Sequence, residues 1–162
     1  MSLGFSFDEV IEMALEMERE GVEFYRALAE REEERKSKEL FLALAEMENE
    51  HLRTFQEMKE QLGSKTLEEL VVDPQGEALL YLKAFVKGKV FKTSPASSPE
   101  QFDSIQDILE FAVSREKDSV VFYLGFMEAM RNDDERARLK KIIREELGHI
   151  AELNQLLEEL SK

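Results

Sequence analysis

At 162 residues the chain is long enough for a single domain with a substantial core. Its net charge of −14 argues against nucleic acid or an anionic membrane as a partner, because both require clustered Lys and Arg. The absence of cysteine excludes disulfides, iron–sulfur clusters and cysteine-based metal modules. With no long uncharged run and no signal-like N-terminus, we predict a soluble cytoplasmic protein.

Two long helices are predicted in the first part of the chain. Apolar residues recur at helical spacing over about residues 7–34, and Ser6 with Glu9 forms a capping box at the start. The charged stretch 31–38 has no apolar face and is predicted to turn or fray. A second apolar stripe predicts a helix over about 40–62.

The middle of the chain, residues 63–102, differs in composition because it contains all three prolines. Pro74 is predicted to occupy the first position of a short helix that runs to about Val86 and ends at Gly88. Residues 93–99 are predicted to form a loop. The remaining chain is expected to form two further long helices.

Both histidines follow a glutamate by three positions, in Glu48–His51 and Glu146–His149. This spacing places the carboxylate and the imidazole on one face of a helix, close enough to share a cation. Each motif alone is weak evidence, because glutamate is abundant in this sequence.

An internal repeat connects the two motifs, since the histidines are 98 positions apart and the same offset aligns other residues. It aligns Glu12 with Glu110, Ala14 with Ala112, Glu18 with Glu116, Val22 with Val120, Phe24-Tyr25 with Phe122-Tyr123, and Glu48 with Glu146. We therefore predict two copies of a helical hairpin.

The predicted turns place further glutamates opposite the motifs. Glu18 and the 48–51 motif lie equally far from the first turn, and Glu116 and the 146–149 motif lie equally far from the second. Pairing of the hairpins would gather four carboxylates and two imidazoles. This set suits two divalent or trivalent ions, since carboxylates can bridge both ions and balance their charge.

These residues resemble the ferritin-like superfamily, and within it the rubrerythrin-type di-iron proteins. The resemblance rests on Glu18 with Tyr25, Glu48 with His51, Glu116 with Tyr123, and Glu146 with His149. It implies an all-α, ferritin-like four-helix bundle in one domain, residues 1–162. Its two hairpins would span about residues 7–62 and 103–162, with a crossover linker over 63–102.

The resemblance also implies a role for each residue at a site holding two iron ions per chain, where manganese or zinc would be alternatives. Glu18 and Glu116 would be terminal ligands, Glu48 and Glu146 bridging ligands, and His51 and His149 one ligand to each metal. Tyr25 and Tyr123 would donate hydrogen bonds to ligand carboxylates, although both are also compatible with a purely packing role.

The chain departs from the rubrerythrin pattern in two ways. Rubrerythrins that reduce peroxide carry another glutamate three residues after the helix-three ligand, where this chain has Ser119. It also lacks the cysteines of a rubredoxin module, so electrons would come from a separate donor protein. The neighbouring acids Glu20, Glu50 and Glu145 are expected to face away from the site, although a change in the predicted helical phase would turn Glu145 toward it.

We therefore expect a di-iron oxidoreductase that reduces hydrogen peroxide or dioxygen. One alternative is an iron-binding or ferroxidase protein without peroxidase turnover, and another is a structural bundle whose site is vestigial or filled by zinc. The apolar residues 79–82 and Phe85 exceed what one face of a crossover helix needs, which favours a homodimer.

Overall fold

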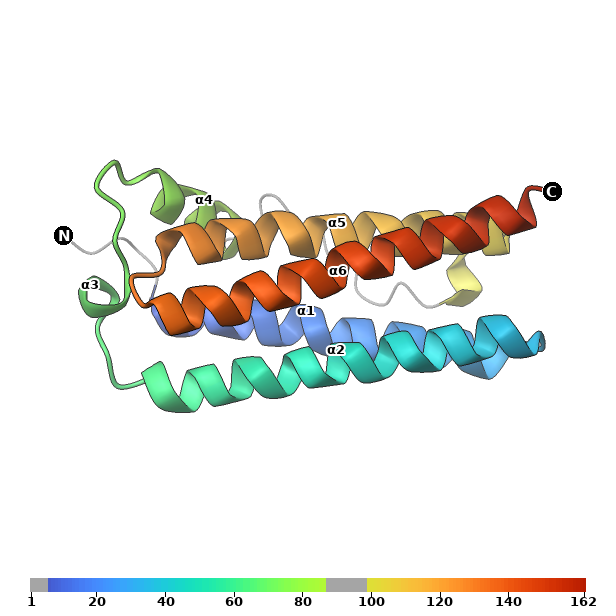
Figure 1. Cartoon of the computed structure of the whole chain (residues 1–162), viewed down its shortest axis with the longest axis horizontal. Helices are drawn as coiled ribbons and strands as arrows, with labels where there is room; N and C mark the ends of the chain where they lie inside the picture. The colour runs from blue at the N-terminus through green and yellow to red at the C-terminus, as the bar shows by residue number, and fades with distance from the viewer. Residues whose placement is uncertain (1–5, 87–98) are drawn as a thin grey trace.

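The computed structural model describes residues 6–86 and 99–162 as a bundle of long helices in two antiparallel pairs (Figure 1). The long helices are α1 (Phe7–Arg31), α2 (Arg35–Leu62), α5 (Ile105–Ala129) and α6 (Asp133–Leu160). The short elements between them are α3 (Leu67–Leu70), α4 (Glu77–Val86) and the 3-10 helix η1 (Pro99–Gln101). The predicted all-α bundle of two hairpins is confirmed.

The first hairpin turn is shorter than the charge pattern predicted. α1 begins with the expected capping box, in which the Ser6 and Glu9 side chains each accept a hydrogen bond from the other's backbone N–H. The turn occupies only residues 32–34, because the Glu34 side chain accepts hydrogen bonds from two backbone N–H groups of α2. This cap keeps residues 35–38 helical despite their charge.

The prediction that Pro74 opens a helix is wrong, since α4 begins at Glu77. Residues 73–76 form a turn in which Gly76 N–H donates to the Asp73 carbonyl at 3.1 Å, and Gly76 has a φ of +75°. Proline is favoured at the second position of such a turn and glycine at the fourth. The Asp73 side chain then accepts a hydrogen bond from the Leu79 N–H, in the first turn of α4.

The two hairpins are joined from one end of the bundle to the other. In Figure 1, α3 and α4 lie at the end where α2 finishes, whereas η1 and the start of α5 lie at the opposite end. The predicted helix end at Gly88 and residues 93–98 of the predicted loop fall outside the described residues, whereas Pro99, the last residue of that loop, begins η1.

The linker is held against the second hairpin at two places. Val72 N–H donates to the Ala129 carbonyl and Arg131 N–H donates to the Leu70 carbonyl, each at 2.9 Å. Further along, α4 lies against α5, where a Cβ atom at Gly125 would be only 2.0 Å from the Tyr81 ring. Glycine is therefore required for this close approach of the two helices.

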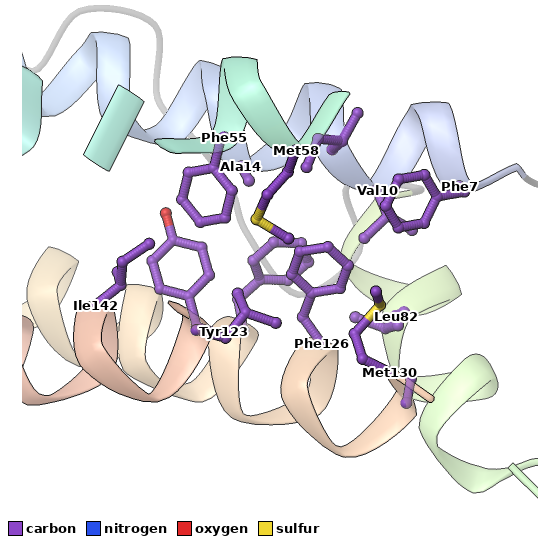
Figure 2. Close-up of a cluster of buried hydrophobic side chains, with 14 of the residues drawn as sticks. Phe7, Val10, Ala14, Phe55, Met58, Leu82, Tyr123, Phe126, Met130 and Ile142 are labelled. Carbon is purple, nitrogen blue, oxygen red and sulfur yellow. The ribbon is translucent and has the colours of Figure 1, made fainter. Parts of the chain in front are cut away.

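Two apolar clusters fill the interior, one toward each end of the bundle. Figure 2 shows the cluster that lies on the α4 side, where Phe7, Phe55, Leu82 and Phe126 pack together.

Within the described ranges, no helix is both long and apolar enough to cross a membrane. Leu80 on α4 is 66% exposed, and the homodimer remains a prediction.

Candidate metal centre

Six polar side chains are buried at mid-bundle, between the two apolar clusters. α1 and α5 each contribute one glutamate, and α2 and α6 each contribute a glutamate and a histidine. Their exposed fractions are 1% for Glu18, 4% for Glu48, 1% for His51, 3% for Glu116, 0% for Glu146 and 4% for His149. The structure thus brings together all six residues that the sequence indicated as metal ligands.

The first group of possible ligands consists of Glu18, Glu48, His51 and Glu146. Three carboxylate oxygens face His51 Nδ1: Glu18 Oε2 at 3.5 Å, Glu48 Oε2 at 3.8 Å and Glu146 Oε1 at 3.4 Å. One atom from each of the four residues lies within 4.8 Å of the others. We call this group the His51 position.

The second group, which we call the His149 position, consists of Glu48, Glu116, Glu146 and His149. His149 Nδ1 lies 3.5 Å from Glu48 Oε1, 3.6 Å from Glu116 Oε1 and 3.0 Å from Glu146 Oε2. Glu48 and Glu146 therefore belong to both positions, with different oxygens facing the two histidines.

These distances fit metal ligands better than a hydrogen-bonded network. Most exceed the range of a good N–H···O hydrogen bond, whereas two donors that bind one ion at about 2.1 Å lie roughly 3 to 3.6 Å apart. Several of the facing atoms are buried with no hydrogen-bond partner among the described residues: Glu18 Oε2, His51 Nδ1, both Glu146 oxygens and His149 Nδ1. Buried polar atoms normally find partners, so this set is chemically suited to holding two cations.

Both predicted tyrosines contact the site, and each reaches across to the other hairpin. Tyr25 donates a hydrogen bond to Glu116 Oε1, and Tyr123 donates one to Glu18 Oε1. Burial, together with the nearby carboxylates, raises the pKa of both hydroxyls well above its usual value, so each remains a proton donor. The hydrogen bond to Glu18 leaves its other oxygen, Oε2, facing His51. In Glu116, the oxygen that accepts from Tyr25 is also the one that lies 3.6 Å from His149 Nδ1.

The expectation that Glu145 faces away from the site is wrong. Its Oε2 lies 2.9 Å from Nε2 of His51, on the opposite side of the ring from the carboxylates of the His51 position. A residue next to Glu146 is rotated by about 100° around the helix, so the ligand pattern alone did not reveal this contact. Glu50 is exposed, as expected, and Glu20 accepts a hydrogen bond from Arg115 at 3.5 Å.

In the metal-free protein, the four carboxylates divide into two kinds. Burial raises the pKa of Glu18 and Glu116 well above its usual value, and the negative charge of Glu48 raises it further. Burial also acts to raise the pKa of Glu48 and Glu146, but contacts with both histidines contribute to lowering it. The two shared glutamates are thus the ones that favour ionisation.

The two imidazoles are held in their charged form when no metal is bound. Burial acts to lower the pKa of His149, but the surrounding Glu116, Glu146 and Glu48 raise it to about 12. The same balance, set by Glu146, Glu18 and Glu48, raises the pKa of His51. In the metal-free site, protons on the histidines therefore provide positive charge that bound metal ions would otherwise provide.

A close backbone approach makes room for one shared carboxylate. A Cβ atom at Gly21 of α1 would lie 3.1 Å from Glu48 Cδ and 3.2 Å from Glu48 Oε2. The repeat aligns Gly21 with Ser119, so the two halves of the site differ at this level. The Ser119 hydroxyl donates instead to the Arg115 carbonyl of its own helix, at 3.2 Å.

Comparisons with known proteins agree with this geometry. A crystal structure described as a candidate ferritin-like diiron-carboxylate protein from Thermotoga maritima is similar to the chain, with a TM-score of 0.68 and 24% identity over 96% of each chain. This likeness shows a ferritin-like fold. No curated protein matches the chain. The family profile described as rubrerythrin matches residues 9–157, and the chain therefore belongs to the rubrerythrin family.

Proposed function

We propose that this protein is a di-iron oxidoreductase that reduces hydrogen peroxide or dioxygen with electrons from a separate donor protein. The observation that carries the proposal is the sharing of Glu48 and Glu146 by the His51 and His149 positions. Two carboxylates that face both positions can bridge two ions, which keeps the ions close enough to act together on one small oxidant.

The donor set is compatible with a redox-active ion. Mixed carboxylate and imidazole ligands suit iron, and they also accept manganese or zinc. When bound, two iron ions would supply the electrons that reduce the oxidant, which zinc cannot do. Membership of the rubrerythrin family, together with the two carboxylates shared by both positions, supports iron as the resident metal.

The chain's own residues would hold and isolate the metals. Glu18 would bind at the His51 position and Glu116 at the His149 position, and each would be oriented by a tyrosine hydroxyl from the other hairpin. With all six ligands at most 4% exposed, the bundle would also exclude bulk water from the centre. Small oxidants fit such a closed site better than large organic substrates.

Metal analysis combined with optical spectroscopy tests the proposal. We expect about two iron ions per chain, and a near-ultraviolet charge-transfer absorption that a reductant removes and peroxide restores. The variant His51→Ala should sharply lower the iron content, and Glu50→Gln provides a matched control at an exposed neighbour. A bundle that binds only zinc, or no metal, would contradict the proposal and support the structural alternative.

A second candidate is an iron-binding or ferroxidase protein without peroxidase turnover, and Ser119 favours it. A serine provides no additional carboxylate at this position, and its hydroxyl donates to the Arg115 carbonyl. Reoxidation of the reduced protein by dioxygen but not by peroxide would support this candidate. The variant Ser119→Glu should then increase peroxide turnover, whereas Ser114→Glu, at an exposed position of the same helix, should not.

A further inference from the structure

The outer nitrogens of the two histidines have different surroundings. His51 Nε2 lies 2.9 Å from Glu145 Oε2, which places a carboxylate behind the ring. His149 Nε2 is also buried, but it has no hydrogen-bond partner among the described residues. Both rings point Nδ1 at the shared carboxylates, so this difference lies on the far side of each ring.

The sequence explains this asymmetry. The offset of 98 that relates the two hairpins aligns Glu145 with Met47. A thioether is at best a weak acceptor for an imidazole N–H. The repeat therefore preserves the six ligand positions but changes the residue that supports one of the histidines.

A carboxylate behind a histidine affects metal binding at its other nitrogen. By accepting the Nε2 proton, Glu145 would fix the tautomer of His51 that leaves Nδ1 free to bind, and it would fix the orientation of the ring. Removing such a partner typically costs about 10- to 100-fold in metal affinity. Glu145 itself is anchored near the surface, where its other oxygen lies 3.9 Å from Lys141 Nζ.

We propose that the two metal positions are unequal: the His51 position binds a divalent ion more tightly than the His149 position, and Glu145 is the positioning residue responsible. This inference rests on the proposed function only in requiring that the buried site binds metal. It predicts a stable state with one ion per chain, held at the His51 position.

Cobalt(II) is a suitable probe, because it accepts the same ligands and its visible absorption reports each binding step. Metal-free protein titrated with Co²⁺ should show two steps, with dissociation constants at least about tenfold apart. In crystals prepared with one equivalent of Co²⁺ per chain, anomalous scattering should show higher occupancy at the His51 position. The occupancy measurement identifies which position fills first.

Two substitutions test the role of Glu145. Glu145→Gln should weaken binding at the His51 position by about 10- to 100-fold, whereas Glu50→Gln, which removes the same charge from an exposed neighbour of His51, should not. Met47→Glu should selectively raise cobalt occupancy at the His149 position. Glu145 has a side chain that is 26% exposed, so its substitution should be compatible with folding, which circular dichroism would check.

Equal filling of both positions at one equivalent would overturn the inference while leaving the proposed function intact. An effect of Glu145→Gln no larger than that of Glu50→Gln would also overturn it. Failure of the wild-type protein to bind cobalt at either position would count against the proposed function as well, so the two failures are distinguishable.

Discussion

The hydroxyl of Tyr25, on the first hairpin, donates a hydrogen bond to Glu116, on the second. Tyr123 makes the reciprocal hydrogen bond to Glu18. Each tyrosine thus orients a carboxylate of the metal centre and joins the two hairpins at the same point. The stability of the bundle and the geometry of the site are coupled through these two contacts.

Replacing Tyr25 with Phe should destabilise the metal-free protein. The change would leave a buried Glu116 oxygen without its donor, and we expect the free energy of unfolding to fall by about 1–3 kcal/mol. Urea denaturation measures the effect. Tyr81→Phe is the control, because that half-exposed hydroxyl donates to the Val121 carbonyl, away from the site. Equal stabilities of wild type and Tyr25→Phe would show that the buried hydrogen bond contributes nothing.

The stability of the metal-free protein should decrease as the pH rises from about 6.5. The pKa of His149 is raised from 6.5 to about 12, so the folded state retains a proton that the unfolded state has lost. Its contribution is complete below 6.5 and is lost progressively toward 12. Glu18 and Glu116 have the same effect. Their pKa values are raised in the folded state, so above pH 4.5 the folded state retains protons that the unfolded state has lost.

At acid pH the sign reverses for the shared carboxylates. The lowered pKa of Glu48 and Glu146 provides stability that is present above 4.5 and is lost as the pH falls. Unfolding measured in urea between pH 4 and pH 9 should therefore give a maximum in mildly acidic solution. Stability that increases steadily from pH 6 to pH 9 would contradict this assignment of protons.

Metal binding should release protons and remove the alkaline decrease in stability. The two histidines, and the raised-pKa carboxylates Glu18 and Glu116, must give up their protons to act as ligands. We expect up to about four protons released per pair of divalent ions. Calorimetric titration in buffers of different ionisation enthalpy measures this number, and binding without proton release would be inconsistent with a protonated metal-free site.

Gly21→Ala should weaken metal binding by altering the position of Glu48. The added methyl group would lie 3.1 Å from Glu48 Cδ, which is too close for the carboxylate to keep its position. We expect about tenfold or greater loss of affinity. Gly148→Ala is the control, because a Cβ atom there meets nothing within 4 Å; it should preserve iron content and stabilise α6 by about 0.5–1 kcal/mol. Similar metal affinities in both variants would show that Gly21 makes no room for the ligand.

Gly125→Ala should loosen α4 without affecting the metal content. Its Cβ atom would lie 2.0 Å from the Tyr81 ring, so the ring and α4 must shift. We expect the free energy of unfolding to fall by about 1–3 kcal/mol. Iron content should not change, because α4 contributes none of the six ligands. In a Tyr81→Ala background the same substitution should cost much less, and an undiminished cost would locate the clash elsewhere.

The sequence predicted the bundle and the six buried residues because both follow from periodicity. Ligand spacing along a helix fixes which side chains share a face, and the offset of 98 repeats that spacing in the second hairpin. Glu145 was expected to face away, with the helical phase left open, because its contact depends on how two hairpins are rotated against each other, which a helical period does not specify. The start of α4 was missed for a local reason, the turn that ends at Gly76.

Each metal position draws ligands from both hairpins. The His51 position includes Glu146 of the second hairpin, and the His149 position includes Glu48 of the first. In a chain without cysteine, a bound pair of ions would be a strong cross-link between the two halves. Unlike a disulfide, a chelator can open this link without a reductant. Metal supply would then govern how firmly the two halves of the protein are held together.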